Sequence, residues 1–149
     1  MEFSLSRTVS MLERTPAVLT ALLAELDDQL THHNYGEGTW SAYEVVGHLL
    51  IGEYDDWIPR LRIILDRGTA RPFDPFPHDA TISPASGRSL DDLLEEFAGA
   101  RAGNLDILAA MHLSDAHWTL RGVHPGLGEV TLAQLLAARE SYGTMAAVD

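Results

Sequence analysis

The chain has 149 residues, 46% of them hydrophobic, a size and composition that suit one domain around one core. Its 22 acidic residues against 10 basic ones give a formal net charge of -12, which repels nucleic-acid phosphates and anionic lipid surfaces. Because the chain has no cysteine, disulfides, thiolate nucleophiles and cysteine-based zinc sites are excluded.

The N-terminal segment and the apolar stretches predict a cytoplasmic protein. MEFSLSRTVSMLERTP lacks the apolar region of a secretory signal, and AVLTALLAEL is too short to span a bilayer. With no composition shift and no repeat, we expect one domain over residues 1–149. Neither nucleic acid nor a membrane is expected as a partner.

The first helix is expected over residues 4–30. Val9 and Leu12 begin an apolar face, and Thr15-Pro16 resembles an N-cap with proline at the first helical position, so the helix is predicted to restart there. One apolar stripe then follows: Val18, Leu19, Leu22, Leu23 and Leu26. The next segment, THHNYGEGTW, has the asparagine and glycines of a loop.

The second helix is expected over residues 41–66. Ser41 and Glu44 match a capping box, in which each side chain satisfies a backbone N–H of the other residue. One face carries Val46, Leu50, Trp57, Leu61 and Ile64, and another carries Ile51, Ile58 and Leu65. A helix that is apolar on two sides contacts two neighbours, or one neighbour and a partner subunit.

A linker over residues 67–88 holds Pro72, Pro75, Pro77 and Pro84 and is not expected to be helical throughout. The second helix would be ~39 Å long, and a linker of this length can reach ~70 Å when extended. It can therefore cross the bundle from end to end, which allows the second and third helices to run parallel.

The third helix is expected to begin at Ser89, with the apolar stripe Leu90, Leu93, Leu94, Phe97, Leu105 and Leu108. A polar stretch that contains the turn HPGLGEV follows. Thr131 is predicted to cap a fourth, shortened helix whose strong apolar residues are Leu132, Leu135 and Leu136. The predicted fold class is all-α, a four-helix bundle with a long crossover between helices 2 and 3.

Seven histidines are candidate metal ligands: His32, His33, His48, His78, His112, His117 and His124. A zinc-type site needs three or more converging ligands, and no two of these histidines have the i, i+4 spacing that lets one helix supply two. His48 lies off the main apolar stripe of the second helix. Its spacing fits either a polar residue at the margin of a packed face or a ligand.

The acidic pairs Asp55-Asp56, Asp91-Asp92 and Glu95-Glu96 are neighbours in sequence and point about 100° apart on a helix. They are interpreted as solvated surface and helix-start charges rather than as a catalytic acid and base. Nucleotide-binding glycine motifs and the serine-nucleophile motif are absent from the sequence.

Four segments together resemble the DinB/YfiT-like superfamily of metal-dependent enzymes, over about residues 5–137. They are TPAVLTALLAEL, GTWSAYEVVGHLLIGEYDDWIPRLRIIL, GRSLDDLLEEFAGARAGNLDIL and HPGLGEVTLAQLLA. The ordered pair of motifs W-S-x-x-E-V-x-G-H-L and H-P-x-x-G-E-V-T-L is the most specific part. The resemblance implies a four-helix bundle with a long connection between helices 2 and 3, often paired as a dimer.

The resemblance also implies a divalent metal (zinc, nickel or iron) bound by three histidines, with His48 as one ligand. Aligning on GEVTLAQLLA places Tyr142 and Ala146 where the other two histidines belong. Alanine has no donor atom, and one imidazole does not make a three-histidine site. The metal site is therefore expected to be incomplete.

Three explanations of the C-terminal segment RESYGTMAAVD remain open: a divergent member that kept the scaffold for binding, a site completed by a second subunit, or a shifted reading frame. The expected function is a binding or interaction scaffold. The alternative is a metal-dependent hydrolase or thiol transferase that uses His48. A homodimer is expected, through the Ile51, Ile58 and Leu65 face or across the shortened fourth helix.

Overall fold

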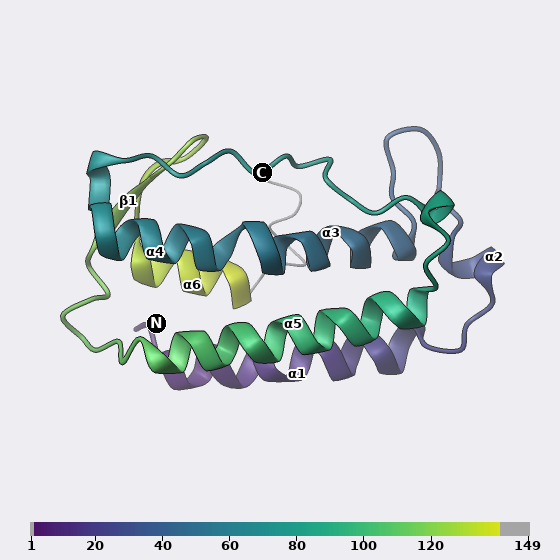
Figure 1. The fold of residues 1–149 in the computed structure, drawn as a ribbon, viewed down its shortest axis with the longest axis horizontal. Coiled ribbons are helices and arrows are strands. Elements are labelled where there is room, and N and C mark those ends of the chain that lie inside the picture. Colours follow the sequence, from purple (N-terminus) through teal and green to yellow (C-terminus); the bar gives the residue numbers. More distant parts are fainter. Residues whose placement is uncertain (1, 141–149) are drawn as a thin grey trace.

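The computed structural model describes residues 2–140, and its long helices lie side by side (Figure 1). The helices are α1 (Leu5–Leu23), α2 (Asp28–Thr31), α3 (Ala42–Asp55), α4 (Trp57–Arg67), α5 (Leu90–Ala110) and α6 (Leu132–Glu140). The described residues also form two 3-10 turns, η1 (Gly68–Ala70) and η2 (Pro84–Ser86), and two strands, β1 (Arg121–His124) and β2 (Gly128–Thr131). The predicted bundle is confirmed, with a small hairpin added to it.

The predicted helix starts are confirmed by their caps. The Ser41 hydroxyl accepts a hydrogen bond from the Glu44 N–H at 3.2 Å, and the Glu44 carboxylate accepts one from the Ser41 N–H at 2.8 Å. Ser89 caps α5 through the Asp92 N–H at 3.0 Å. Thr131 caps α6 through the Gln134 N–H at 3.1 Å. Short polar side chains at these positions satisfy N–H groups that have no partner within the helix.

The first helix differs from the prediction at Pro16 and at its end. The chain stays helical through Pro16, so the predicted restart at Thr15 is wrong. Proline has no N–H for the Leu12 carbonyl one turn earlier. That carbonyl instead accepts a hydrogen bond from Arg101 Nη1 at 3.0 Å. The helix ends at Leu23 rather than near residue 30, and Glu25 then adopts a left-handed φ of 64°.

The second predicted helix is two helices, α3 and α4, separated by Asp56 with φ -104° and ψ -85°. The physical reason is Pro59. Its ring removes the N–H that would bond to the Asp55 carbonyl and crowds that carbonyl. α4 continues along the direction of α3, but the break at Asp56 changes the side of the helix on which the following side chains lie.

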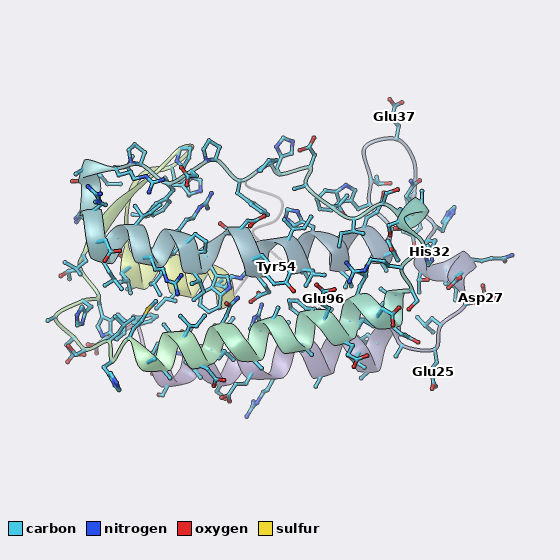
Figure 2. All side chains as sticks on the ribbon, viewed as in Figure 1. Glu25, Asp27, His32, Glu37, Tyr54 and Glu96 are labelled. Carbon is cyan, nitrogen blue, oxygen red and sulfur yellow. The ribbon has the colours of Figure 1, made fainter. Side chains whose placement is uncertain are left out.

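The linker crosses the bundle as predicted, and α5 therefore runs parallel to α3 and α4 (Figure 1). The Thr81 hydroxyl donates a hydrogen bond to the Glu44 carbonyl of α3. A Cβ on Gly47 would lie 2.8 Å from the Ile82 backbone nitrogen, so a glycine is needed where the linker passes over α3. On the solvent side, the Tyr54 hydroxyl donates to Glu96 at 2.8 Å and joins α3 to α5 (Figure 2).

The segment expected to be a polar turn contains an antiparallel hairpin in which Arg121 pairs with Thr131 and His124 with Gly128. The hairpin is fastened to the linker, because the Phe73 N–H donates to the Val123 carbonyl at 2.9 Å. A Cβ on Gly122 would lie 2.5 Å from the Phe73 ring, so glycine permits this close approach. Four-residue strands leave too short an alternation for the pattern to be seen in the sequence.

Two apolar clusters fill the bundle. One contains Tyr43, Val46, Leu50, Leu93 and Phe97, and the other contains Trp57, Leu61, Ile64, Leu108, Leu132 and Leu136. Ile58 is buried and Leu65 packs against the second cluster, so the second face of the 41–66 segment is used within the chain. Exposed apolar residues instead include Val18 and Leu22 of the predicted apolar stripe on α1.

Among residues 2–140, none of the helices combines the length and the apolar character that crossing a membrane requires.

Candidate functional site

His48 is buried under the linker, with 4% of its surface exposed, rather than at the margin of a packed face. Its Nδ1 donates a hydrogen bond to the Ala80 carbonyl at 2.6 Å. The Trp40 and Phe76 rings pack against the imidazole, with centroids 4.8 and 5.4 Å away. These contacts make His48 part of the fastening between α3 and the crossover.

The other histidines do not converge on His48 to form a ligand set. His32 stacks on Tyr43 near the N-terminus of α3, and His124 belongs to the hairpin. Within the described part of the chain, no group of three or more histidine, cysteine or acidic residues could hold a metal ion. Tyr142 and Ala146, which stand at the other two expected ligand positions, lie outside the described residues.

A buried charged layer separates the two apolar clusters. Glu53 of α3, with 1% of its surface exposed, lies at its centre. Its Oε1 accepts hydrogen bonds at 2.7 Å from Nη2 of Arg101 on α5 and at 2.7 Å from Nη2 of Arg139 on α6. Its Oε2 accepts from the Trp57 indole N–H at 3.0 Å and from the Asn104 amide at 3.0 Å. Both carboxylate oxygens are therefore satisfied, as a buried charge requires.

The charged layer continues through Asp56, which lies in the break between α3 and α4. Asp56 Oδ2 lies 3.5 Å from Nη1 of Arg139, and Oδ1 lies 3.0 Å from Nη1 of Arg60. The interpretation of Asp55-Asp56 as solvated charges is therefore wrong for Asp56, which is buried. Pro59 explains the difference, because the break that it causes places Asp56 inside.

The electrostatics of Glu53 favour its charged form. Burial on its own raises the pKa, but the hydrogen bond from Arg101 and the positive charges of Arg139 and Arg101 outweigh burial. The net result is a pKa lowered from 4.5 to about 2. At neutral pH, Glu53 is thus a carboxylate held between two guanidinium groups, an arrangement that cross-links helices rather than one that transfers protons.

A cavity of about 570 Å³ opens beside this layer, between α4, the hairpin and α6. Asp56, Arg60, Arg139, His124 and Gln134 contribute polar groups, and Trp57, Leu127, Val130 and Leu135 contribute apolar walls. A volume of this size, with few polar groups in an apolar lining, is typical of small-molecule sites. The cavity is the candidate functional site.

The charged layer was missed in the sequence although a signal was present. Glu53 lies three residues after Leu50 and four before Trp57, so it occupies a position on the apolar stripe. Arg101 follows Phe97 by four residues in the stripe of α5. Arg139 follows Leu132 by seven in the stripe of α6. A charge at the core position of three separate helices indicates that the charges meet.

Comparisons with known proteins agree with this architecture. The family model of the DinB superfamily matches residues 11–138, nearly the whole chain. The chain belongs to the DinB superfamily. No curated protein matches it.

Among solved structures, this DinB-superfamily chain is similar to YfiT from Bacillus subtilis, described as a probable metal-dependent hydrolase with an unusual four-helix bundle topology. The TM-score is 0.78 with 19% sequence identity, over 95% of this chain and 80% of YfiT. At this identity the likeness shows a shared fold. A shared fold does not identify a reaction, which depends on the residues of the site.

Proposed function

We propose that this DinB-superfamily chain functions by binding a ligand in the cavity between α4, the hairpin and α6, and that it lacks the three-histidine metal site implied by the family resemblance. The observation that carries this proposal is the pairing of the two buried carboxylates that follow His48 along the chain, Glu53 and Asp56. Glu53 is held by Arg101 and Arg139, and Asp56 is held by Arg139 and Arg60.

A carboxylate that is ion-paired with guanidinium groups must give up those bonds before it can ligate a metal, and the positive charges beside it repel a cation. His48 alone does not make a tetrahedral site. Among the described residues, no three histidine, cysteine or acidic side chains come together as ligands, so the residues there do not fit a three-ligand metal site. The same ion pairs support a rigid wall for the cavity, because they tie α3, α4, α5 and α6 together.

The test of this proposal is the metal content of purified, untagged protein, measured by elemental mass spectrometry. His48→Ala is compared with His33→Ala, which changes an exposed loop histidine. We expect substoichiometric zinc, nickel and iron in all three proteins. Near-stoichiometric metal that is retained in His33→Ala but lost in His48→Ala would contradict the proposal, provided that circular dichroism shows both variants folded.

A second candidate is a metal-dependent hydrolase or thiol transferase in which His48 is one ligand. One contact favours it: because Nδ1 of His48 donates to the Ala80 carbonyl, the neutral ring carries its lone pair on Nε2. Metal-binding histidines are commonly oriented by such a hydrogen bond to a backbone carbonyl. The metal measurement separates this candidate from the first.

A further inference from the structure

We propose that the cavity between α4, the hairpin and α6 binds a small uncharged alcohol with an apolar body. This inference deepens the proposed binding function and rests on it. It names a ligand class from two features of the cavity wall. The charged groups of the wall are buried in ion pairs, and the surface left to a ligand is mostly apolar.

The buried charges of the wall are engaged with one another. Arg60 Nη1 lies 3.0 Å from Asp56 Oδ1, and Arg139 Nη1 lies 3.5 Å from Asp56 Oδ2. Asp56, Arg60 and Arg139 each have 7% or less of their surface exposed. To bond with one of these groups, a charged ligand would have to displace a buried partner, which is strongly unfavourable. The charged layer therefore gives an ionic ligand no advantage over an uncharged one.

Two further polar side chains of the wall form hydrogen bonds within the protein. Nδ1 of His124 accepts from the N–H groups of Gly126 and Leu127 at 3.0 and 3.2 Å. The side-chain oxygen of Gln134 accepts from the Thr131 N–H at 2.8 Å, at the start of α6. These bonds hold the hairpin turn and the beginning of α6, so they shape the wall of the cavity.

The rest of the wall is largely apolar and comes from three elements. α4 contributes Trp57, the hairpin contributes Leu127 and Val130, and α6 contributes Leu135 and Ala138. Leu127 is 54% exposed, although turns of this kind usually carry small or polar residues. An exposed leucine beside a cavity of about 570 Å³ indicates a surface for the apolar part of a small ligand.

The exposed charge of the lining distinguishes an alcohol from an acid. Glu129 on β2 is exposed and belongs to the lining, and the chain as a whole has a formal net charge of -12. Both features repel an anion that approaches the cavity. A hydroxyl group can instead donate a hydrogen bond to the Glu129 carboxylate without bringing a charge. The wall therefore favours an alcohol over the acid with the same carbon skeleton.

The test is calorimetric titration of the full chain with molecules that share a carbon skeleton. Butan-1-ol, hexan-1-ol and octan-1-ol measure the dependence on apolar area, and hexanoate and hexylammonium measure the effect of charge. We expect the affinity to rise about three- to fourfold for each added methylene group, as when one CH₂ is buried. Hexanoate and hexylammonium should each bind at least about tenfold more weakly than hexan-1-ol, because a charge would lose its hydration. The heat capacity change on binding should be negative, since apolar surface is buried.

Two substitutions of the wall locate the alcohol in this cavity. Ala138→Leu adds a larger side chain to the lining on α6 and should weaken hexan-1-ol binding at least about tenfold, because it occupies the space of the ligand. Ala109→Leu, at an exposed position of α5, is its control. Leu127→Ala removes an apolar contact on the hairpin and should weaken binding about three- to tenfold. Its control is Leu120→Ala, a substitution of an exposed leucine that does not line the cavity.

Four results would each overturn the inference: hexanoate or hexylammonium bound as tightly as hexan-1-ol, affinity that does not rise with chain length, no binding of any alcohol, or binding that neither Ala138→Leu nor Leu127→Ala weakens. Failure of the proposed function is distinguishable from these results. Metal lost on His48→Ala would overturn the proposed function whatever the titrations show. Hexanoate that binds more tightly than hexan-1-ol, and is displaced by Ala138→Leu, would overturn only the ligand class.

Discussion

Arg101 on α5 reaches across the bundle to Glu53 on α3, with Nη2 2.7 Å from Oε1, and the same guanidinium donates through Nη1 to the Leu12 carbonyl on α1. That carbonyl is available because Pro16, one turn later, has no N–H. The Leu12 carbonyl and the Glu53 carboxylate thus both accept hydrogen bonds from Arg101. The contact ties three helices together at the boundary between the two apolar clusters.

Glu53 should make stability depend on pH below about 4.5. Because its pKa is lowered from 4.5 to about 2 in the folded state, the unfolded chain binds this proton more tightly. The contribution, about 3 kcal/mol by linkage, is therefore fully present above pH 4.5 and is lost as the pH falls toward 2. Urea unfolding at pH 7, 5, 4 and 3 measures it.

The control for this pH dependence is Glu53→Gln, which keeps the shape of the side chain but removes its charge. We expect it to lower the free energy of unfolding at pH 7 by about 3–5 kcal/mol, because Arg101 and Arg139 then lose a buried partner. The difference between the two proteins should shrink as the pH falls from 4.5 to 2. A difference that stays constant over this window would show that Glu53 titrates normally.

Gly47→Ala should loosen the crossover from α3. The added methyl group would lie 2.8 Å from the Ile82 backbone nitrogen and 3.0 Å from the Thr81 hydroxyl, so the linker must shift. That shift endangers the hydrogen bonds that Thr81 makes to the Glu44 carbonyl and His48 makes to the Ala80 carbonyl. We expect a loss of about 1–3 kcal/mol in thermal or urea unfolding, as for other overpacked sites.

Gly103→Ala is the matched control for Gly47→Ala, because it is also a helical glycine but has nothing within 4 Å of the added methyl group. Alanine is favoured over glycine in a helix by about 1 kcal/mol. Gly103→Ala should therefore be neutral or stabilising. If both substitutions stabilise the protein equally, the close approach of the linker to α3 is not a constraint.

The same argument applies to the hairpin. Gly122→Ala would place its methyl group 2.5 Å from Phe73 and 2.7 Å from Ile64, so β1 must move away from α4. We expect a loss of about 1–3 kcal/mol of stability and weaker ligand binding, because the hairpin forms part of the cavity wall. Gly126→Ala, whose nearest neighbour is His124 at 3.6 Å, should change the free energy of unfolding far less.

Local sequence signals predicted the starts of three helices and the crossing of the linker. Ser41, Ser89 and Thr131 begin helices because their side chains cap N–H groups, and the length of the linker allows the parallel crossover. The break at Asp56 was missed because the apolar pattern continues on both sides of it. Pro59 was the sequence signal for this break, because a proline disrupts the helical turn that precedes it.

The candidate site was harder to predict because its parts come from distant segments. The apolar stripes were identified from their hydrophobic residues alone. The charged residues Glu53, Arg101 and Arg139 within those stripes were therefore not predicted to be buried. His48 was singled out by family resemblance, and its contacts with Ala80 and Trp40 depend on a linker path that no local pattern specifies. Tyr142 and Ala146 lie outside the described residues, and their part in any metal site stays a prediction.

Homodimerisation remains a prediction, and the structure changes the surface that we expect to carry it. Ile58 is buried within the chain, whereas Val18 and Leu22 on α1 are 54% and 65% exposed. These two residues lie one turn apart on the same side of α1 as the exposed Met11. Apolar side chains that line up on one helix face are typical of a contact between subunits.

Light scattering coupled to size-exclusion chromatography, at micromolar concentration, should give the mass of two chains. Leu22→Asp should shift the mass toward one chain, since a charge would be buried against apolar partners. Val45→Asp, at an exposed position of α3, should leave the mass unchanged. A single-chain mass for the unmodified protein would contradict dimerisation, and dissociation by Val45→Asp alone would move the interface from α1 to α3.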